Sequence, residues 1–548
     1  MQKVLTAAEI REIDRLTTEK YGIPSMLLME NAAQATARAI AERFDGDVEG
    51  LSCLIICGKG NNGGDGAALG RVLWQMGVNV EICLIGLLSA TSGDARANFD
   101  IVKKISDHDQ FEPTAAELTF EEITSLEEWY EYDAVNFQSD DPDVIVDALF
   151  GTGLDKPLDG VYEQAAALIY SYNGSSEDGG PYIVSLDIPS GLCADRSQVV
   201  GINPCADLTV SFTAPKLANV LPPAANFNGE LRVACIGSPK DLIESTQSKL
   251  FVAEKCDVLK WLEATEFSYD SYKNKRGHAL LVAGAANYAG AAVLCGNAAI
   301  RTGVGLVTIA TPVSSRDMIG GRVTPEVMVR GVPETEKGAV AYEAAAALED
   351  FLDKIDVIAI GSGLSSTDES TRRFVQSMIK NRKKPIVLDA DGLNVLTDED
   401  LTPSDEFPLI LTPHEGEFLR LLGTEDKSVL DDRVSAVRDF AEKYGAIVVL
   451  KGARNLVASP DGRVSINPTG NPGLGKAGNG DTLTGIIAGF IGQGVKCNVD
   501  LFETIVAAVY IAGLAGDIAD KKYGKRVMTA SDVRDCLGEA FELAAEES

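Results

Sequence analysis

The sequence predicts an α/β protein of two domains, residues 1–244 and residues 245–548, each built on a largely parallel sheet. Short apolar runs alternate along the chain with segments long enough for helices, a pattern typical of βαβ units. At 548 residues, the chain is also longer than the ~100 to 200 residues that a single core usually serves. The alternation weakens once, over residues 238–277, so we place the domain boundary there, near Ser245.

The elements of the first domain follow from local signals. Thr6 and Glu9 have the spacing of a capping box, and Ile10 and Ile13 follow with helical spacing. We therefore expect an amphipathic helix at the start of the chain, and a second helix over residues 25–40. The expected strands of this domain are residues 51–57, 79–85, 144–149, 182–186 and 207–212.

The second domain shows the same alternation but different turn chemistry after its strands. We therefore expect a second α/β domain that is not a repeat of the first. Because open parallel sheets bind ligands beyond the carboxyl ends of their strands, two independent sites are expected. The expected strands are residues 279–283, 305–310, 357–360, 385–388, 409–411 and 446–450.

The charge of the chain excludes some classes of partner. Lys and Arg number 49 against 81 Asp and Glu, so the formal net charge is −32. Such a surface repels nucleic-acid backbones and anionic lipid. Residues 106–143 contain thirteen Asp or Glu and no Lys or Arg, which we interpret as a solvated acidic insertion.

The cysteines and the apolar segments point to a cytoplasmic protein. The ten cysteines form no CxxC pair, so we expect reduced thiols. The N-terminus carries charge throughout and lacks the apolar core of a secretory signal. The longest apolar stretch, residues 505–516, is shorter than the ~20 residues of a membrane-spanning helix. No membrane segment is therefore expected.

Polar residues follow three predicted strands of the first domain. The first strand runs into GKGNNGGDG, residues 58–66, where five glycines in nine positions let the backbone aim its N–H groups at an anion. Asp147 precedes GTGLDKP, and Asp187 and Ser190 stand in DIPSGL. With Asn62 they offer the oxygen ligands that hard cations prefer. The alternative for each is a helix cap or an Asx turn.

The first domain resembles the N-terminal domain of the NAD(P)H-hydrate epimerases, which implies a Rossmann-like three-layer fold. Five ordered motifs within residues 1–240 carry the resemblance: LTAAEIREIDRLTTEKYGIPSMLLMENAA, GKGNNGGDG, DALFGTGL, SLDIPSGL and TAPK. The family pattern does not need the acidic stretch of residues 106–143. The resemblance implies potassium (K+) ligands at Asn62, Asp147 and Ser190. It implies that the hydrated dinucleotide binds Asn61, Asn62, Gly63, Gly64, Asp65, Gly151, Thr152, Gly153, Leu154, Asp155, Lys156, Pro157 and Asp187.

Asp187 has two interpretations. Epimerisation at C6 of a hydrated nicotinamide requires the C–O bond to break and to re-form from the other face. A proton donor and a proton acceptor must therefore lie near that hydroxyl. Asp187 is our candidate for this acid/base role, and the alternative is that it only binds the ribose hydroxyls.

A glycine-rich sequence near the end of the chain predicts a phosphate site. The segment NPTGNPGLGKAGNGDTLTGIIAGF, residues 467–490, can form a nest of backbone N–H groups at the start of a helix over residues 482–491. Asp481 stands at that helix start, where it is either the N-cap or a catalytic base.

Two more strand ends of the second domain carry charged residues. Lys451 and Arg454 follow one buried strand, and His414, Glu415 and Glu417 follow another. A lone histidine is more often structural than catalytic, so we expect His414 to contact the substrate rather than to act as a base.

These motifs, with GHALLVAGAANYAGA, DVIAIGSGLS and PIVLDADGLNVL, resemble the ADP-dependent NAD(P)H-hydrate dehydratases, which have a ribokinase-like fold. The match spans residues 245–545. Glu415 stands where proline is commoner, and Ala286 where serine is usual. The resemblance implies that the hydrated nucleotide contacts Gly363, Pro413, His414, Glu415, Gly416, Glu417, Phe418, Leu419 and Asp481. It implies that ADP contacts Lys451, Gly452, Ala453, Arg454, Asn455, Asn471, Pro472, Gly473, Leu474, Gly475, Lys476, Ala477, Gly478, Asn479 and Gly480.

The resemblance also implies a mechanism for dehydration. Asp481 removes the proton of the C6 hydroxyl as this hydroxyl attacks the β-phosphate of ADP, and the oxygen then leaves as part of phosphate. Backbone N–H groups of residues 475–480 and Lys451 stabilise the charge on the transferring phosphoryl group. Mg2+ is expected with the nucleotide, although the sequence shows no cage of carboxylates for it.

We interpret the chain as a bifunctional cytoplasmic enzyme of metabolite repair, which epimerises hydrated NADH or NADPH and dehydrates the S epimer with ADP. The expected partners are these small molecules and further copies of the chain in a homo-oligomer, with no nucleic acid and no membrane. One rival is a ribokinase-like vitamin kinase fused to an unrelated binding domain. The other makes the N-terminal domain a non-catalytic module that binds nucleotides or scaffolds a complex. A vitamin kinase would not depend on ADP and would not produce the absorbance of NADH, so these two properties distinguish the first rival from a repair enzyme. The net charge of −32 argues against an RNA-binding role for the N-terminal domain in the second rival.

Overall fold

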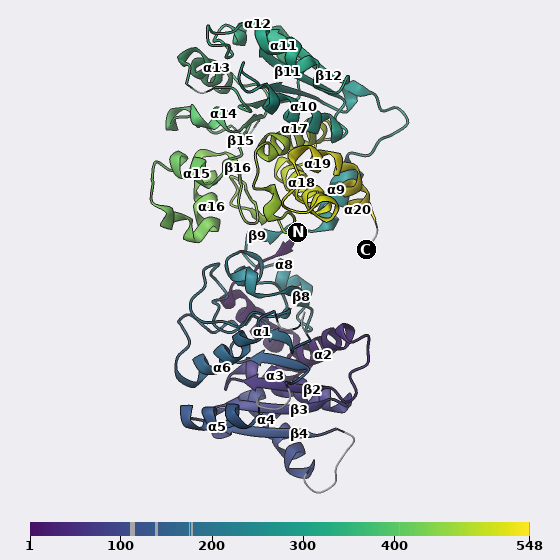
Figure 1. The fold of residues 1–548 in the computed structure, drawn as a ribbon, viewed down its shortest axis with the longest axis vertical. Helices are drawn as coiled ribbons and strands as arrows, with labels where there is room; N and C mark the ends of the chain where they lie inside the picture. The colour runs from purple at the N-terminus through teal and green to yellow at the C-terminus, as the bar shows by residue number, and fades with distance from the viewer. Residues whose placement is uncertain are drawn as a thin grey trace. The chain divides into compact units, whose positions relative to one another are not determined.

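The computed structural model describes residues 1–109, 116–136, 141–174, 176, 179–365, 367–404 and 406–546. The chain divides into two compact units (Figure 1), Lys3–Ser248 and Lys249–Ser548. Met1–Gln2 belong to the second unit. The boundary therefore lies a few residues after the position that we predicted near Ser245.

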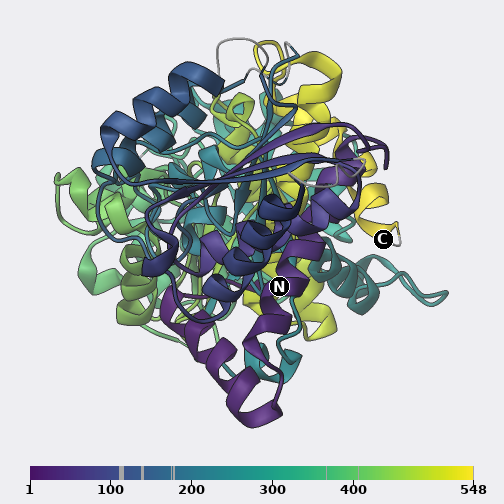
Figure 2. The ribbon, with the colours of Figure 1, turned by 90° about the horizontal axis from the view of Figure 1, so that it is seen from below.

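The N-terminal unit is built on a seven-stranded sheet in the order β4-β3-β2-β5-β6-β7-β8, in which all neighbours are parallel. Figure 2 shows the twist of its strands. The order reverses between β2 and β5, so the carboxyl ends of these strands form the switch point where such sheets bind ligands. The strands are β2 (Ser52–Cys57), β3 (Asn79–Ile85), β4 (Leu118–Ile123), β5 (Val144–Ala148), β6 (Tyr182–Leu186), β7 (Leu208–Phe212) and β8 (Glu230–Ala234).

Helices cover both faces of this sheet. Along β2, Cys53, Ile55 and Cys57 belong to one apolar core, and Leu54 and Ile56 belong to the core on the other face. The unit therefore has the three layers expected of a Rossmann-like domain. Its helices are α1 (Ala7–Tyr21), α2 (Ser25–Arg43), α3 (Asn61–Gln75), η1 (Leu88–Ala90), α4 (Gly93–Asp109), α5 (Leu126–Asn136), α6 (Gly160–Ser171), α7 (Leu217–Val220), η3 (Ala224–Phe227) and α8 (Lys240–Glu244).

The local signals at the start of the chain are confirmed. The Thr6 hydroxyl accepts a hydrogen bond from the Glu9 N–H at 3.2 Å, and the Glu9 carboxylate accepts one from the Thr6 N–H at 2.9 Å. The five strands predicted for this domain are present, and β4 and β8 are additional. All ten cysteines are free thiols, as expected.

The acidic stretch of residues 106–143 is part of the fold, so the predicted solvated insertion is wrong for its described part. It contains β4, the edge strand that pairs with β3, and α5. Leu118 and Ile123 are buried, and Trp129 is only 1% exposed. The prediction was based on the density of acidic residues in this stretch. Enough apolar residues lie between the acids, however, to bury one side of β4 and one side of α5. Residues 110–115 and 137–140 lie outside the described residues.

The C-terminal unit is built on an eleven-stranded sheet in the order β1-β9-β18-β17-β16-β15-β14-β13-β10-β11-β12. The strands from β16 to β12 in this order are parallel, and β17 is antiparallel to both of its neighbours. The strands are β1 (Gln2–Lys3), β9 (Leu250–Val252), β10 (His278–Val282), β11 (Leu306–Pro312), β12 (Val327–Val332), β13 (Val357–Ile360), β14 (Ile386–Leu388), β15 (Leu409–Leu411), β16 (Ile447–Leu450), β17 (Leu456–Ala458) and β18 (Val464–Ile466).

The six strands predicted for this domain are all present. The short strands β17 and β18, which extend the sheet, were not predicted. The helices are α9 (Lys255–Ala264), η4 (Lys273–Lys275), α10 (Ala289–Arg301), α11 (Val313–Gly320), α12 (Ala344–Leu352), α13 (Glu369–Lys380), α14 (Asp391–Asn394), η5 (Asp398–Asp400), α15 (Glu415–Leu421), η6 (Lys427–Asp432), α16 (Arg433–Tyr444), η7 (Pro472–Leu474), α17 (Asn479–Cys497), α18 (Leu501–Tyr523), α19 (Ala530–Asp535) and α20 (Leu537–Ala545).

Helix α18 is more apolar than the sequence analysis allowed. By length and composition it could cross a membrane, with a hydropathy of 1.6 over an 18-residue window, but 67% of that window is buried inside the structure. The expectation that no stretch reaches spanning length is therefore wrong for this helix. A helix that is apolar all round also suits a position in the core, and α18 packs there against α17, α9 and α20.

The crossing of α17 and α10 depends on a glycine. A Cβ on Gly485 would lie 2.1 Å from the carbonyl oxygen of Cys295. We expect Gly485→Ala to lower the free energy of unfolding of this unit by about 1 to 3 kcal/mol, because the helices would have to move apart. Gly538→Ala is the matched control, since a Cβ there meets nothing within 4 Å. Urea denaturation measures both, and an unchanged stability of Gly485→Ala would contradict this account of the packing.

Candidate functional site

In the N-terminal unit, β2 leads into the glycine-rich segment at the switch point. β2 ends at Cys57 and α3 begins at Asn61, so most of the segment predicted as a loop is the first turn of a helix. A Cβ on Gly58 would lie 2.0 Å from the carbonyl oxygen of Leu149. A Cβ on Gly63 would lie 1.8 Å from the carbonyl oxygen of Gly58. These two glycines are therefore required by close backbone packing.

Two polar side chains from separate segments, Asn62 and Asp187, lie beside Gly151. The side-chain oxygen of Asn62 lies 3.1 Å, and Asp187 Oδ2 lies 3.3 Å, from the position of a Cβ on Gly151. The side-chain nitrogen of Asn62 is buried without a hydrogen-bond partner. Leaving a buried donor unpaired is costly, so the arrangement suits a polar ligand next to Gly151.

Asp147 and Ser190 are in direct contact beneath this point. Asp147 is fully buried and accepts hydrogen bonds from the Ser190 N–H at 2.7 Å and the Ser190 hydroxyl at 2.5 Å. The Ser185 hydroxyl donates a third at 3.1 Å. Burial raises the pKa of Asp147, and the hydrogen bonds from Ser190 oppose this shift. The structure thus brings together two of the three predicted potassium ligands.

Asp187 is held by a lysine that the sequence analysis did not assign. Its Oδ1 forms an ion pair with Lys216 and accepts a hydrogen bond from the Phe212 N–H at 3.2 Å. Its backbone has a φ of 67°, a region that residues other than glycine rarely adopt and that is often associated with function. With Oδ1 engaged, Oδ2 is the oxygen that faces Gly151.

Lys216 is a buried cation with every proton in use. Its side chain is 1% exposed. Besides Asp187, the ammonium donates to the Ser211 hydroxyl at 3.1 Å and to the Phe212 carbonyl at 2.9 Å. The TAPK motif contains this lysine directly after a buried strand, and that position was the only sequence signal for it.

Two further carboxyls share the electrostatic environment of this pair. Burial raises the pKa of Asp14, on α1, to about 6, with Lys216 lowering it and Asp187 raising it. Burial also raises the pKa of Asp65, on α3, well above its usual value, and the charges of Asp187 and Asp14 add to the shift. The site therefore combines an ion-paired carboxylate with two carboxyl groups whose pKa values burial raises. The sequence carries no signal for Asp14, because the residue fits the pattern of an amphipathic helix and belongs to no motif.

In the C-terminal unit, the switch point lies between β10 and β13. Gly363 follows β13 with a φ of 61°, and a Cβ there would lie 2.7 Å from Tyr288 Cβ at the start of α10. Glycine is therefore required for the chain to pass this helix. Asp389, Thr412 and Lys451 follow the next strands of the same edge, β14, β15 and β16.

Asp481 lies in the first turn of α17, and it is not the cap of this helix. The helix begins at Asn479 with Gly478 as its N-cap, which has a φ of 91°. The predicted helix start at residue 482 was therefore too late, and the N-cap alternative for Asp481 is wrong. Burial raises the pKa of Asp481 to about 6, the charge of Asp389 adds to the shift, and Lys451 opposes it. A carboxyl with this pKa can accept a proton near neutral pH.

Several residues assigned to ligands by the resemblance have structural partners. The Lys476 ammonium donates hydrogen bonds to the carbonyls of Lys525, Arg526 and Met528 at 2.6 to 2.9 Å. The lysine therefore stabilises the loop of residues 525–528. Asn471 caps η7 through the Gly473 N–H at 2.9 Å. The polar side-chain groups of these two residues are therefore engaged within the protein, and their contact with ADP stays a prediction.

The residues after β15 show the same division. His414 is the N-cap of α15, and its Nδ1 accepts hydrogen bonds from the N–H groups of Gly416 at 3.1 Å and Glu417 at 3.3 Å. Phe418 is fully buried, with its ring 5.3 Å from that of Phe440. Leu154 of the N-terminal unit is likewise a core side chain. Both side chains face the core, so the predicted substrate contacts of these two residues, which stay predictions, would have to involve their backbone.

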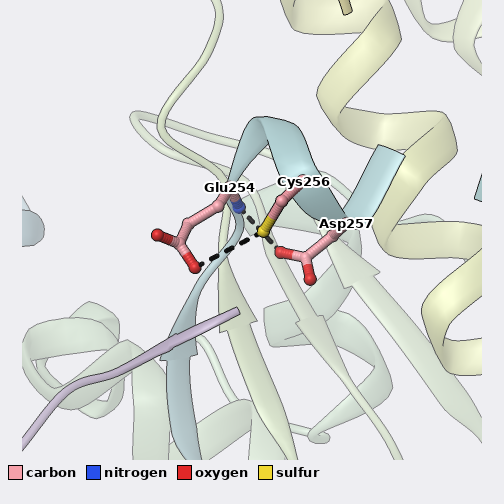
Figure 3. Close-up of side chains that lie close together, drawn as sticks. All are labelled: Glu254, Cys256 and Asp257. Carbon is pink, nitrogen blue, oxygen red and sulfur yellow. Dashed lines mark hydrogen bonds between the residues drawn. The ribbon is translucent and has the colours of Figure 1, made fainter. Parts of the chain in front are cut away.

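One cluster outside these sites has the composition of a metal site. The side chains of Glu254, Cys256 and Asp257 converge at the start of α9 (Figure 3). Asp257 Oδ2 accepts the Glu254 N–H at 2.9 Å, as in a capping box. Burial, with the nearby charges of Asp257 and Glu254, raises the pKa of the Cys256 thiol, which disfavours the thiolate that a metal needs. We interpret the cluster as a helix cap.

The geometry of the two sites is typical of α/β enzymes, and one of the sites lies at a helix start suited to phosphate. Two family models match the chain, "YjeF-related protein N-terminus" over residues 25–218 and "NAD(P)H-hydrate dehydratase" over residues 279–538. A bifunctional NAD(P)H-hydrate repair enzyme of Moorella thermoacetica is 39% identical over 540 residues, which cover 97% of this chain and 96% of the relative. The enzyme of the same name from Thermofilum pendens is 36% identical, over 100% of this chain and 97% of the relative.

The chain therefore belongs to the family of bifunctional NAD(P)H-hydrate repair enzymes. The resemblance inferred from the motifs is confirmed for both domains. Among solved structures, the ADP/ATP-dependent NAD(P)H-hydrate dehydratase of Bacillus subtilis, co-crystallised with ATP and Mg2+, is 32% identical. It covers 54% of this chain and 98% of its own, with a TM-score of 0.46.

The buried pair of Lys216 and Asp187 makes a prediction about stability. We expect Lys216→Met to lower the free energy of unfolding of the N-terminal unit by about 3 to 5 kcal/mol, because it leaves a buried carboxylate without its cation. Adding Asp187→Asn should recover part of this loss. Chemical denaturation measures both variants.

The control for this pair is Lys240→Met. The Lys240 ammonium lies 3.5 Å from the Glu244 carboxylate, and both side chains are exposed. Such pairs contribute about 0 to 1 kcal/mol. If Lys216→Met lowered the free energy of unfolding no more than Lys240→Met does, the stabilising role of the buried ion pair would be contradicted.

Proposed function

We propose that the N-terminal domain interconverts the R and S epimers of hydrated NADH or NADPH, and that the C-terminal domain dehydrates the S epimer with ADP. We assign the first activity to residues 1–244 and the second to residues 245–548. The observation that carries the proposal is the presence, in each domain, of a carboxylate that can move a proton at the C6 hydroxyl: Asp187, directly after β6, and Asp481, in the first turn of α17. Membership in the family supports the pairing of the two activities.

Epimerisation needs one proton donor and one acceptor. The C6–O bond breaks as the hydroxyl leaves with a proton from a carboxyl group, and the electron pair of ring nitrogen N1 forms the C6=N1 iminium. Water then adds to the opposite face and gives a proton to a carboxylate. Asp187 suits the acceptor, because Lys216 and the Phe212 N–H hold Oδ1 and leave Oδ2 toward Gly151. Asp65 and Asp14, whose pKa values are raised, suit the donor.

This geometry favours acid/base chemistry by Asp187 over ribose binding alone. Residues 61–65 and 151–157 would then bind the dinucleotide, chiefly through backbone N–H groups at the switch point, since Leu154 faces the core.

We place potassium at Asn62, Asp147 and Ser190. Their oxygen atoms fit this ion, because Asp147 is a buried carboxylate whose described contacts are hydrogen bonds from neutral groups. When bound, the ion would supply positive charge at this buried carboxylate. Asn62 carries a buried side-chain nitrogen without a partner, so it is available to turn toward a ligand.

Dehydration begins when Asp481 takes the proton of the C6 hydroxyl. The hydroxyl oxygen attacks the β-phosphorus of ADP, the bond to the bridging oxygen breaks, and AMP leaves. The C6–O bond then breaks with the release of phosphate, and loss of a proton from C5 restores the C5=C6 bond of NADH or NADPH. Lys451 and the N–H groups at the start of α17 stabilise the charge on the transferring phosphoryl group.

The nucleotide would lie along the loops that follow β16 and β18. We assign residues 451–455 and 471–480 to ADP, and Gly363 with residues 413–419 to the hydrated nucleotide, the Phe418 side chain excepted. Mg2+ would arrive with ADP and neutralise part of its phosphate charge, and we assign no protein ligand to it. We also retain as proposals the cytoplasmic location, the homo-oligomer and the absence of nucleic-acid and membrane partners.

The decisive experiment incubates the purified chain with a mixture of both hydrate epimers, with and without ADP, and follows the absorbance of the reduced nicotinamide. Complete conversion is expected only with ADP, because epimerisation alone releases no NADH. A vitamin kinase would consume ATP without releasing NADH. A non-catalytic N-terminal domain would leave the R epimer to slow spontaneous exchange, so conversion would stop near the S fraction of the mixture.

Asp187→Asn tests the epimerase site. Asparagine is nearly isosteric but cannot accept a proton, so we expect R-epimer conversion to fall on the order of 10²-fold or more. ADP-dependent dehydration of the S epimer should persist in the same preparation. Unchanged epimerase turnover would leave Asp187 a binding residue at most.

Asp481→Asn tests the dehydratase site. We expect turnover to fall on the order of 10²-fold or more with no loss of ADP affinity, because the variant retains the shape of the side chain but not the base. Single-turnover dehydration at saturating ADP measures the loss, and a thermal melt checks the fold. Near-normal turnover in this variant would contradict the assignment of Asp481 as the catalytic base. Exchange between the epimers should be untouched.

A further inference from the structure

Asp389 is a buried carboxylate of the C-terminal site to which the mechanism above gives no role. It follows β14 and is 1% exposed. Its Oδ1 accepts hydrogen bonds from the Lys451 ammonium at 2.9 Å and from the Thr412 hydroxyl at 2.8 Å. Thr412 and Lys451 follow β15 and β16, the next two strands of the sheet. Three consecutive strand ends thus fix this oxygen.

The pair of Asp389 and Lys451 lies beside the start of α17. The Lys451 ammonium is 3.6 Å from the position of a Cβ on Gly480, in the first turn of that helix. A helix start carries partial positive charge and unpaired N–H groups. An ammonium placed there is repelled by the helix unless a negative charge holds it, and Asp389 supplies that charge.

We propose that Asp389 is a positioning residue for phosphoryl transfer, which holds the Lys451 ammonium beside the first turn of α17, where Asp481 lies. The inference rests on the proposed function, since it deepens the role of the ADP site. It requires no contact between Asp389 and the reacting atoms.

Electrostatics gives this role a measurable sign. The groups that face Asp481 are Asp389 and Asp391, which raise its pKa, Lys451, which lowers it, and the Ser362 hydroxyl, which also lowers it. The Cys295 thiol on α10 is also near, and burial raises its pKa well above the usual value, so it is neutral. Removing the charge of Asp389 therefore lowers the pKa of Asp481 directly. It also frees Lys451 to act on Asp481, which shifts the pKa in the same direction.

The experiment measures dehydration of the S epimer by the full chain against pH, for wild type and Asp389→Asn. We expect turnover near pH 7 to fall on the order of 10- to 100-fold, because Lys451 loses its anchor. The acid limb of the profile should move to lower pH by about half to one unit. A folded Asp389→Asn variant with wild-type turnover and an unmoved acid limb would overturn the inference.

Two controls separate position from charge. Thr412→Val removes a hydrogen bond to the same oxygen without changing any charge, so the acid limb should stay in place. Asp391→Asn removes a carboxylate that acts less strongly on Asp481 than Asp389 does, so its shift should be smaller. A limb that moves equally in Asp389→Asn and Thr412→Val would mean general distortion of the site and would also overturn the inference.

Two further measurements keep the inference testable. If Asp389→Asn does not melt cooperatively, Lys451→Gln is measured in its place. The acid limb of its pH profile should move to higher pH, because the lysine lowers the pKa of Asp481. An unmoved acid limb would contradict the coupling between Lys451 and Asp481. Calorimetric titration of ADP against pH reports the ionisation of Asp481 without turnover, because an ionised carboxylate there weakens binding of the anion. Its midpoint should fall in Asp389→Asn even if the reaction is not the one proposed. Failure of the inference and failure of the proposed function are therefore distinguishable.

Discussion

Burial of carboxylates at the carboxyl ends of parallel strands is the constraint on which the rest of this structure depends. A carboxylate out of water is stable only with a cation or several hydrogen-bond donors. Asp187 has Lys216, Asp389 has Lys451, and Asp147 has donors from three residues. Lys216, Lys451 and Ser190 come from segments that follow other strands, so hydrogen bonds and ion pairs as well as packing connect neighbouring strand ends.

The parallel topology makes these meetings possible. Both sheets reverse their strand order at an internal strand pair, β2 and β5 in one and β10 and β13 in the other. Loops on either side of such a reversal diverge and leave space at the edge of the sheet. Glycines bring the backbone close at the same points: a Cβ on Gly58 would lie 2.0 Å from one carbonyl oxygen and a Cβ on Gly361 1.8 Å from another. Close packing there places polar side chains around the space that remains.

The two sites solve related chemical problems with different means. Both act on the C6 hydroxyl of a hydrated nicotinamide under our proposal. The N-terminal site offers several carboxyl groups, in which Asp14 and Asp65 have raised pKa values and Asp187 is ion-paired with Lys216. The C-terminal site offers one base, Asp481, and positive charge at a helix start for phosphate. Exchange of water at C6 needs only protons, whereas its removal needs a better leaving group.

The sequence by itself determined the α/β class, eleven of the strands, the capped first helix and the strand-end motifs, because these depend on local periodicity and turn chemistry. Only the tertiary structure decided which charges are paired and which protons are held. Lys216, Asp14 and Asp389 became site residues through partners distant in the chain, and Lys476 and Phe418 lost side-chain roles for the same reason. Local pattern does not encode burial, and burial sets the cost of a charge, so ion pairs and pKa shifts emerge only when the strand ends meet.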